Sequence, residues 1–203
     1  AILQDDPVNR AFMAFNSFVD NMLMFYSLKS NRYQGFAVGP DSFTQGIVRE
    51  GKTKEFEAFL KTQGIDYDLT EVDINGQKDI YCRFSNGSVP FSSIASTGTH
   101  SLALFYYWYL KMEKTSFVYI DEYDAFYHFE LSQEIVKMLK KLENTQVILS
   151  THNTDLISND LLRPDTYFII KDNKIRSFDQ ISSKELRRAH NIQKMYKAGS
   201  FDE

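Results

Sequence analysis

Apolar and polar residues alternate with different periods along the chain, and each period predicts a different element. Between residues 7 and 30, large apolar residues recur at the spacing of one helix face, which predicts a single long helix. Residues 54–62 have the same spacing and predict a shorter helix. The pair Asn75-Gly76 separates the runs 71–74 and 78–84, and it predicts a β-hairpin because Asn-Gly favours tight turns.

From residue 91 onward, helical and strand patterns alternate, which is typical of a parallel α/β sheet. The expected elements, in order, are helix 100–114, strand 117–120, helix 131–142, strand 146–149, a hairpin of 167–170 and 174–178, and a last helix 183–198. The chain is therefore expected to have two regions. Residues 1–90 form a helical and mixed α/β segment with a connecting hairpin, and residues 91–203 form a lobe whose mainly parallel sheet is flanked by helices.

Composition and charge narrow the functional classes. The chain has 203 residues, of which 43% are hydrophobic and 25% charged, so it can bury a core and is not disordered. Its net charge of −4 gives no electrostatic support for a nucleic-acid-binding surface. The single cysteine, Cys82, excludes an intramolecular disulfide and fits a reducing cytoplasm. We expect a cytoplasmic protein without a membrane partner, because neither a signal peptide nor a membrane-spanning apolar run is present.

Polar residues follow two of the apolar runs at the point where each predicted strand ends. Asp121 and Glu122 follow the first, and Ser150-Thr151-His152 follow the second. The carboxyl ends of parallel strands meet at one edge of a sheet, so these side chains describe a site for metal-assisted phosphoryl transfer. An Asp there can hold Mg²⁺, a Glu can orient or deprotonate the attacking water, and a His can sense the γ-phosphate.

A third polar segment, Ser96-Thr97-Gly98-Thr99, directly precedes the helix expected at 100–114. Small residues at a helix N-terminus let backbone N–H groups approach a phosphate, and the helix dipole favours an anion there. The same residues are equally typical of an ordinary Ser/Thr helix cap. The segment alone is compatible with a phosphate site and with a simple helix cap. Its position in the chain, before the Asp-Glu pair and the His, favours the phosphate site.

In order and spacing, these segments resemble the C-terminal half of an ABC-type ATPase head, the group that includes SMC and Rad50 proteins. Residues 96–99 resemble a degenerate ABC signature, 118–122 resemble Walker B with its catalytic Glu, 123–128 resemble the D-loop region, and His152 resembles the switch His. More narrowly, residues 120–128, 150–156 and 196–201 are similar to bacterial AAA15/AAA21-type, OLD-like ATPases. Such proteins often occur in anti-phage and abortive-infection systems. The resemblance covers roughly residues 60–201 and implies a P-loop NTPase-like fold of the ABC-head type.

The resemblance implies a mechanism in which two heads form a homodimer around two ATP molecules. Ser96, Thr97 and Gly98 would contact ATP on the partner head, with Ser96 and Gly98 at its γ-phosphate. Asp121 would support Mg²⁺, Glu122 would activate water, and His152 would hold the γ-phosphate. Asp124 would couple the two sites across the interface. ATP would hold the dimer together and hydrolysis would release it, in the service of an effector protein or of nucleic acid bound through other regions.

An ABC head also needs a phosphate loop, and residues 46–53 contain a literal match that runs from Gly46 to Lys52 and Thr53. The residues before it, 41–45, are mostly polar, whereas a phosphate loop follows an apolar strand. Its interior, 47–50, places bulky side chains and a carboxylate where backbone amides should surround phosphates. Because the chain also begins in mid-pattern at Ala1, we expect a fragment whose Walker A loop lies in a missing N-terminal segment.

Three alternatives stay open at this stage. The first is a self-contained small P-loop NTPase or kinase that uses Gly46 to Thr53. The second is a non-catalytic interaction module that keeps the fold, although the intact Asp-Glu pair argues against it. The third is a nuclease in which Asp121, Glu122, Asp124 and His128 bind a divalent metal without ATP.

Overall fold

A computed structural model describes residues 6–27, 32–35, 42–182, 186 and 190–201 of the chain. These residues form two compact units. The first contains the described residues up to Tyr127 together with 141–150, and the second contains 128–140 and those from 151 onward. Within the described residues, no helix is both long and apolar enough to cross a membrane.

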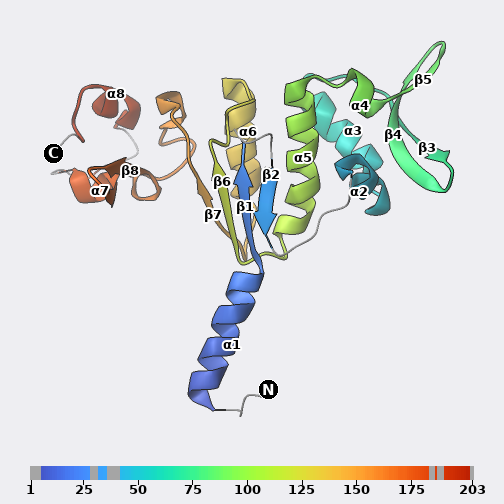
Figure 1. Cartoon of the computed structure of the whole chain (residues 1–203). Coiled ribbons are helices and arrows are strands. Elements are labelled where there is room, and N and C mark those ends of the chain that lie inside the picture. Colours follow the sequence, from blue (N-terminus) through green and yellow to red (C-terminus); the bar gives the residue numbers. More distant parts are fainter. Residues whose placement is uncertain (1–5, 28–31, 36–41, 183–185, 187–189, 202–203) are drawn as a thin grey trace. The chain divides into compact units, whose positions relative to one another are not determined.

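The first unit is built on a four-stranded sheet with the strand order β2-β1-β6-β7 (Figure 1). The strands are β1 (Met22–Tyr26), β2 (Arg32–Gly35), β6 (Phe117–Asp121) and β7 (Gln146–Leu149). Strand β6 lies in the middle and runs parallel to both β1 and β7, while β2 adds an antiparallel edge. The sheet is mainly parallel, so the expected α/β fold class is confirmed.

Helix α5 (Thr97–Met112) covers one face of this sheet. Alternate strand residues, among them Phe25 and Val118, are buried on that face. The Trp108 ring of α5 packs edge-on against Phe25 with 5.8 Å between the ring centroids. Burial of such aromatic and aliphatic side chains, at about 25 cal/mol per Å² of apolar surface, is the main force that fixes the position of α5 on the sheet.

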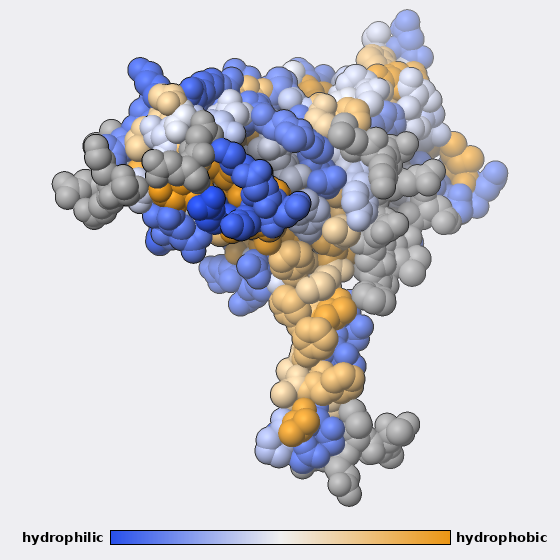
Figure 2. Space-filling model, turned by 60° about the vertical axis from the view of Figure 1, so that its left-hand side comes forward, coloured by the Kyte–Doolittle hydropathy of each residue, from blue (hydrophilic) through white to orange (hydrophobic). Residues whose placement is uncertain are grey.

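Residues 7–30 do not form one helix, so that expectation is wrong. Helix α1 (Pro7–Asp20) begins at the Asp6 cap and stops at Asn21, where β1 starts. The reason is that residues 22–26 alternate between half-buried and buried positions and pair along their whole length with β6. Residues 28–30 lie outside the described part of the chain. Several large apolar side chains of α1 are exposed (Figure 2): Val8, Phe12, Met13, Phe15 and Phe18.

The remainder of the first unit consists of short helices and a three-stranded antiparallel sheet. The helices are α2 (Phe43–Arg49), α3 (Thr53–Thr62) and α4 (Phe91–Ile94), and the strands are β3 (Leu69–Ile74), β4 (Gln77–Phe84) and β5 (Gly87–Pro90). The hairpin expected on the Asn75-Gly76 turn is confirmed, since Ile74 pairs with Gln77 across it.

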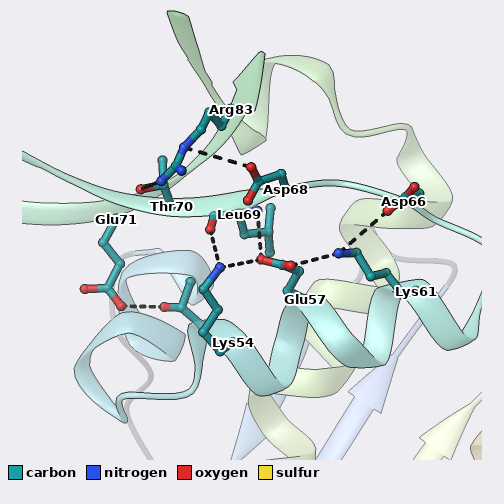
Figure 3. A network of polar contacts seen from close by, with 10 residues as sticks. Lys54, Glu57, Lys61, Asp66, Asp68, Leu69, Thr70, Glu71 and Arg83 are labelled. Atoms are coloured by element: carbon teal, nitrogen blue, oxygen red, sulfur yellow. Dashed lines mark hydrogen bonds and ion pairs between the residues drawn. The ribbon is translucent and has the colours of Figure 1, made fainter. Parts of the chain in front are cut away.

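A network of polar contacts ties α3 to β3 (Figure 3). The Glu57 carboxylate accepts hydrogen bonds from Lys54 Nζ at 2.8 Å, Lys61 Nζ at 2.9 Å and the backbone N–H of Leu69 at 3.0 Å. Lys54 Nζ also donates to the Leu69 carbonyl at 3.1 Å. The first residue of β3, Leu69, therefore has its backbone N–H and carbonyl satisfied by side chains of α3, as buried backbone groups require.

The second unit contains α6 (Phe129–Leu139), two 3₁₀ turns, η1 (Thr154–Leu156) and η2 (Pro164–Thr166), a hairpin of β8 (Phe168–Lys171) and β9 (Lys174–Ser177), and the short helices α7 (Phe178–Ile181) and α8 (Ile192–Lys197). Its aromatic cluster is centred on Phe178, which stacks on Phe201 with 4.4 Å between centroids and on Tyr167 with 5.7 Å. Phe178 and Phe201 are each 2% exposed, so this stack forms a core for the last part of the chain.

The last helix is shorter than the expected 183–198. It begins at Ile192, because the side chain of Asn191 accepts a hydrogen bond from the Lys194 N–H and so caps the helix there. Of the residues before it, 186, 190 and 191 are not helical, and 183–185 and 187–189 lie outside the described residues. The helix is followed by Gly199 at φ +76°, a common way to end a helix.

Candidate nucleotide-hydrolysis site

Asp121 and Glu122 occupy the end of the central strand β6. Asp121 is the last residue of the strand, and Tyr119, two residues earlier, lies on the same face. Asp121 Oδ1 accepts two hydrogen bonds, one from the Ser150 hydroxyl at 2.7 Å and one from the Tyr119 hydroxyl at 3.1 Å. Ser150 directly follows the neighbouring strand β7, whose Leu149 is in register with Ile120. The parallel register therefore brings the Ser hydroxyl to the carboxylate.

Glu122 has a backbone conformation that is uncommon for a residue with a side chain. Its φ is +50°, in the left-handed region. Two hydrogen bonds to Ser150 flank this turn: the Glu122 N–H donates to Ser150 Oγ at 2.8 Å, and the Tyr123 N–H donates to the Ser150 carbonyl at 3.1 Å. Strained backbone of this kind concentrates at functional sites, where the surrounding structure holds it in place.

The pKa of the Tyr119 phenol is raised. A hydrogen bond with Ser150 acts to lower this pKa, but partial burial and the adjacent Asp121 carboxylate together outweigh it. A phenol with a raised pKa stays protonated at neutral pH and can keep donating its proton to the carboxylate. Asp121 is thus held by two neutral hydroxyl donors.

The Ser96–Thr99 segment caps α5 and also lies against the loop after β6. Ser96 Oγ accepts from the Thr99 N–H at 3.1 Å, so the helix-cap reading of this segment is confirmed. A Cβ atom on Gly98 would come within 3.2 Å of the Phe126 carbonyl oxygen. The Tyr127 hydroxyl donates to the Ser101 carbonyl of α5 at 3.1 Å. The structure therefore places the signature-like segment next to the D-loop-like segment that contains Asp124.

Ser96 and Thr97 are exposed, and Gly98 is half-buried. They lie at the N-terminus of a 16-residue helix, where the helix dipole favours an anion. Tyr127 continues the D-loop segment with an enclosed hydroxyl, and desolvation there raises the pKa of Tyr127. A neutral, hydrogen-bonded phenol at this position fixes the loop to the helix.

His152 belongs to the second unit and is exposed. The residues after it form a small cap in which Asn153 accepts from the Asp155 N–H at 3.0 Å. Asp155 in turn accepts hydrogen bonds from Lys197 Nζ at 2.7 Å and Gln193 Nε2 at 2.6 Å. The segment that follows the candidate switch His is thereby attached to the last helix, which connects two of the motifs that carry the resemblance.

Residues 46–53 do not form a phosphate loop. They lie in α2, in a turn and at the start of α3, and Ile47 is fully buried. The backbone N–H of Gly46 donates to the Ser42 carbonyl, and those of Glu50, Gly51 and Lys52 donate to carbonyls of residues 46–48. Lys52 Nζ pairs with Glu55 at 2.9 Å. Since a phosphate loop needs its backbone N–H groups for the phosphates, this geometry is incompatible with one.

The donor set at β6 suits Mg²⁺ in the presence of ATP. Mg²⁺ is commonly bound through one or two carboxylates together with the phosphates of the substrate, and Asp121 supplies one such carboxylate. Within the described part of the chain, no group of three or more His, Cys, Asp and Glu side chains is arranged to hold a metal ion.

Sequence reasoning missed Tyr119 as a member of this site, and it placed Ser150 at the end of the second strand without giving its hydroxyl a role. The alternation of β6 places residue 119 on the face of residue 121, which could have indicated Tyr119. The hydroxyl of Ser150 stood in the sequence at the end of a predicted strand, but its partner depends on the register between β6 and β7. Register between strands separated by a helix is not encoded in either strand alone.

Comparison with known proteins identifies the family of ATPase domains to which the chain belongs. Among curated proteins, none matches the chain in sequence. A protein-family match, in contrast, covers residues 6–158, which include the Ser96–Thr99 segment, the Asp121-Glu122 pair and His152. The matched range is most of the chain and contains the whole sheet of the first unit. The chain therefore belongs to the family described as "AAA domain, putative AbiEii toxin, Type IV TA system".

Proposed function

We propose that this AAA-type ATPase domain binds Mg-ATP between two copies of itself and hydrolyses it. The observation that carries the proposal is the end of β6, where two hydroxyls hold Asp121 and where Glu122 is kept in a left-handed conformation. A carboxylate fixed beside a second, differently directed carboxylate is what metal-assisted attack of water on a phosphate requires.

Each residue has a chemical role in the proposal. Asp121 would hold Mg²⁺, which neutralises the charge that develops on the phosphate oxygens. Glu122 would accept a proton from the attacking water or orient it. His152 would hydrogen-bond the γ-phosphate. Its exposure leaves the imidazole accessible to a ligand.

Two features support a dimer with ATP at its interface. The N-terminus of α5 presents Ser96 and Thr97 to solvent, and an exposed helix N-terminus can bind the γ-phosphate of a nucleotide on the partner head. Gly98 lies against the backbone of the loop that contains Asp124. A ligand at the signature-like segment of one head can therefore displace the segment proposed to couple the two sites.

The phosphate loop of the site is proposed to lie outside these 203 residues, because the backbone N–H groups of residues 46–53 are engaged within α2 and the turn after it. We also propose that ATP-driven association controls an effector protein, or nucleic acid bound through other regions, in the cytoplasm. Buried Cys82, whose pKa is raised to about 11 by desolvation and by Asp68, is compatible with a reducing compartment. We propose a role in bacterial anti-phage defence or a DNA transaction for this domain, whose family description names a putative AbiEii toxin and a type IV TA system.

The proposal is tested by ATP turnover and association of the full-length protein that the gene encodes. Wild type should hydrolyse ATP only with a divalent cation and should dimerise on adding Mg-ATP, as measured by light scattering after gel filtration. Glu122→Gln should lower kcat by about 10²- to 10⁴-fold, as loss of a general base does, and should prolong the ATP-bound dimer. Glu143→Gln, an exposed carboxylate elsewhere, is the matched control.

Absence of both turnover and ATP-dependent association in wild type would refute the proposal. Association without turnover would instead identify a non-catalytic interaction module that uses ATP as a ligand.

A further inference from the structure

We propose that Ser150 is a positioning residue, whose single hydroxyl fixes Asp121 and Glu122 relative to one another. This inference rests on the proposed function, since it names the residue that positions the two carboxylates of the same site. Ser150 Oγ donates to Asp121 Oδ1 at 2.7 Å and accepts from the Glu122 N–H at 2.8 Å. One rotatable group therefore joins the side chain of the proposed metal ligand to the backbone of the proposed base.

The hydrogen bonds to Asp121 select one of its two oxygens. Both Ser150 and Tyr119 donate to Oδ1, so Oδ2 is the oxygen that can take a cation. Two donors on one oxygen also fix the plane of the carboxylate, because rotation about the Cβ–Cγ bond would break both. Partners of this kind, one step away from a metal, orient the ligand and tune its basicity.

The hydrogen bonds to Glu122 act on the backbone instead of the side chain. Glu122 at φ +50° is flanked by two contacts with Ser150, one to its hydroxyl and one, from Tyr123, to its carbonyl. Loss of the hydroxyl removes the acceptor on the Glu122 side alone. We expect the turn to relax toward a common conformation and the Glu122 side chain to leave its productive direction.

Tyr119 provides the comparison that separates these two effects. Its hydroxyl donates to Asp121 Oδ1 at 3.1 Å and also interacts with Ser150, whereas the Glu122 N–H donates to the Ser150 hydroxyl. Tyr119→Phe removes a donor to Asp121 but leaves the Ser150 hydroxyl in place to accept from Glu122, so it should weaken mainly the metal site, whereas Ser150→Ala should weaken the metal site and misplace the base. Ser150→Thr keeps a hydroxyl at the same position and is the conservative control.

The first measurement is metal binding without turnover, on the full-length protein with an ATP analogue that cannot be hydrolysed. Electron paramagnetic resonance of Mn²⁺ gives the Kd directly. Ser150→Ala and Tyr119→Phe should each raise this Kd by about 10- to 100-fold, the usual cost of losing a partner of a metal ligand. Glu122→Gln and Ser150→Thr should leave it within about twofold of wild type.

The second measurement is kcat at a metal concentration that saturates each variant. Tyr119→Phe should recover the wild-type kcat, and Ser150→Ala should remain at least about tenfold below it, with thermal unfolding measured to confirm that both fold. A wild-type protein that hydrolyses ATP, beside a Ser150→Ala variant with unchanged Mn²⁺ Kd and unchanged kcat, would overturn the role of Ser150. If the kcat of Ser150→Ala recovered fully at saturating metal, Ser150 would position Asp121 only, and the proposed joint positioning of Asp121 and Glu122 would be overturned. A wild type that neither binds Mn²⁺ with the analogue nor hydrolyses ATP would count against the proposed function instead.

Discussion

Gly98 lies so close to the carbonyl oxygen of Phe126 that a Cβ atom at residue 98 would approach that oxygen to 3.2 Å. The contact joins the first turn of α5 to the loop that follows β6, and the hydrogen bond from Tyr127 to Ser101 joins the same two elements. The segment proposed to contact ATP on the partner head and the segment proposed to couple the two sites are thus in direct contact within one head. A shift of either segment must move the other.

Gly98→Ala tests this contact. Alanine favours helix by about 0.5–1 kcal/mol over glycine, but the added methyl must push the Phe126 backbone by a few tenths of an ångström. We expect these effects nearly to cancel in the free energy of unfolding, to within about 1 kcal/mol. ATP-dependent association and turnover should nevertheless fall by about tenfold, because the loop with Asp124 is displaced. Unchanged turnover in a stable variant would show that the contact is only packing; Ser93→Ala, exposed in α4, is the control.

The α3–β3 network predicts a pH dependence of stability. Hydrogen bonds from Lys54 and Lys61, aided by the Leu69 N–H and opposed by partial burial, lower the pKa of Glu57 from 4.5 to about 2. A lowered carboxyl pKa adds stability that is fully present above pH 4.5 and is lost as pH falls from 4.5 toward 2. Glu57→Gln should therefore lower the free energy of unfolding by about 1–2 kcal/mol near pH 6 and by little near pH 2. The expected loss is small because both lysines are exposed to solvent.

Urea unfolding of both proteins between pH 2 and pH 7 measures this difference. A gap between wild type and Glu57→Gln that stays constant over the range would contradict the assignment of the lowered pKa. Asp66→Asn is the control, since its carboxylate is 89% exposed and lies 3.7 Å from Lys61.

Lys52→Ala decides whether residues 46–53 bind nucleotide. The structure places Lys52 in an exposed pair with Glu55 and engages the surrounding N–H groups internally. Mg-ATP binding measured by calorimetry should be the same for the wild-type chain and for Lys52→Ala, and thermal unfolding should change little because exposed ion pairs contribute little. Binding by the wild-type chain that Lys52→Ala abolishes would restore the self-contained P-loop reading.

Local signals in the sequence were sufficient for part of the fold. Asn75-Gly76 predicted its hairpin because few residues other than Asn and Gly adopt the positive φ values of such a turn, and both do so here. Strands β6 and β7 were predicted because each is a short apolar run that ends in polar residues. The boundary at residue 90 that sequence reasoning placed between two regions stays a prediction.

Long-range pairing accounts for what could not be predicted. The run 22–26 fits a helical stripe and a strand equally well, and its pairing with β6, more than 90 residues away, decides for the strand. Asp121 and Glu122 were identified from their place after an apolar run. Their support by Ser150 was not, because it requires the register of β6 against β7. His152 as a γ-phosphate ligand stays a prediction.

Phe201→Ala tests whether the end of the chain is part of the folded second unit. Phe201 is 2% exposed and stacks on Phe178, which also stacks on Tyr196 of α8 with 6.0 Å between centroids. Removal of such a ring costs about 3–5 kcal/mol, so α8 should detach and its amide hydrogens should exchange at rates near those of an unfolded chain. Hydrogen exchange followed by mass spectrometry measures this. Ile170→Ala, whose side chain is 75% exposed, should leave α8 protected. If α8 stays equally protected in both variants, the aromatic stack does not hold the last helix, and the contact between Asp155 and Lys197 must do so without it.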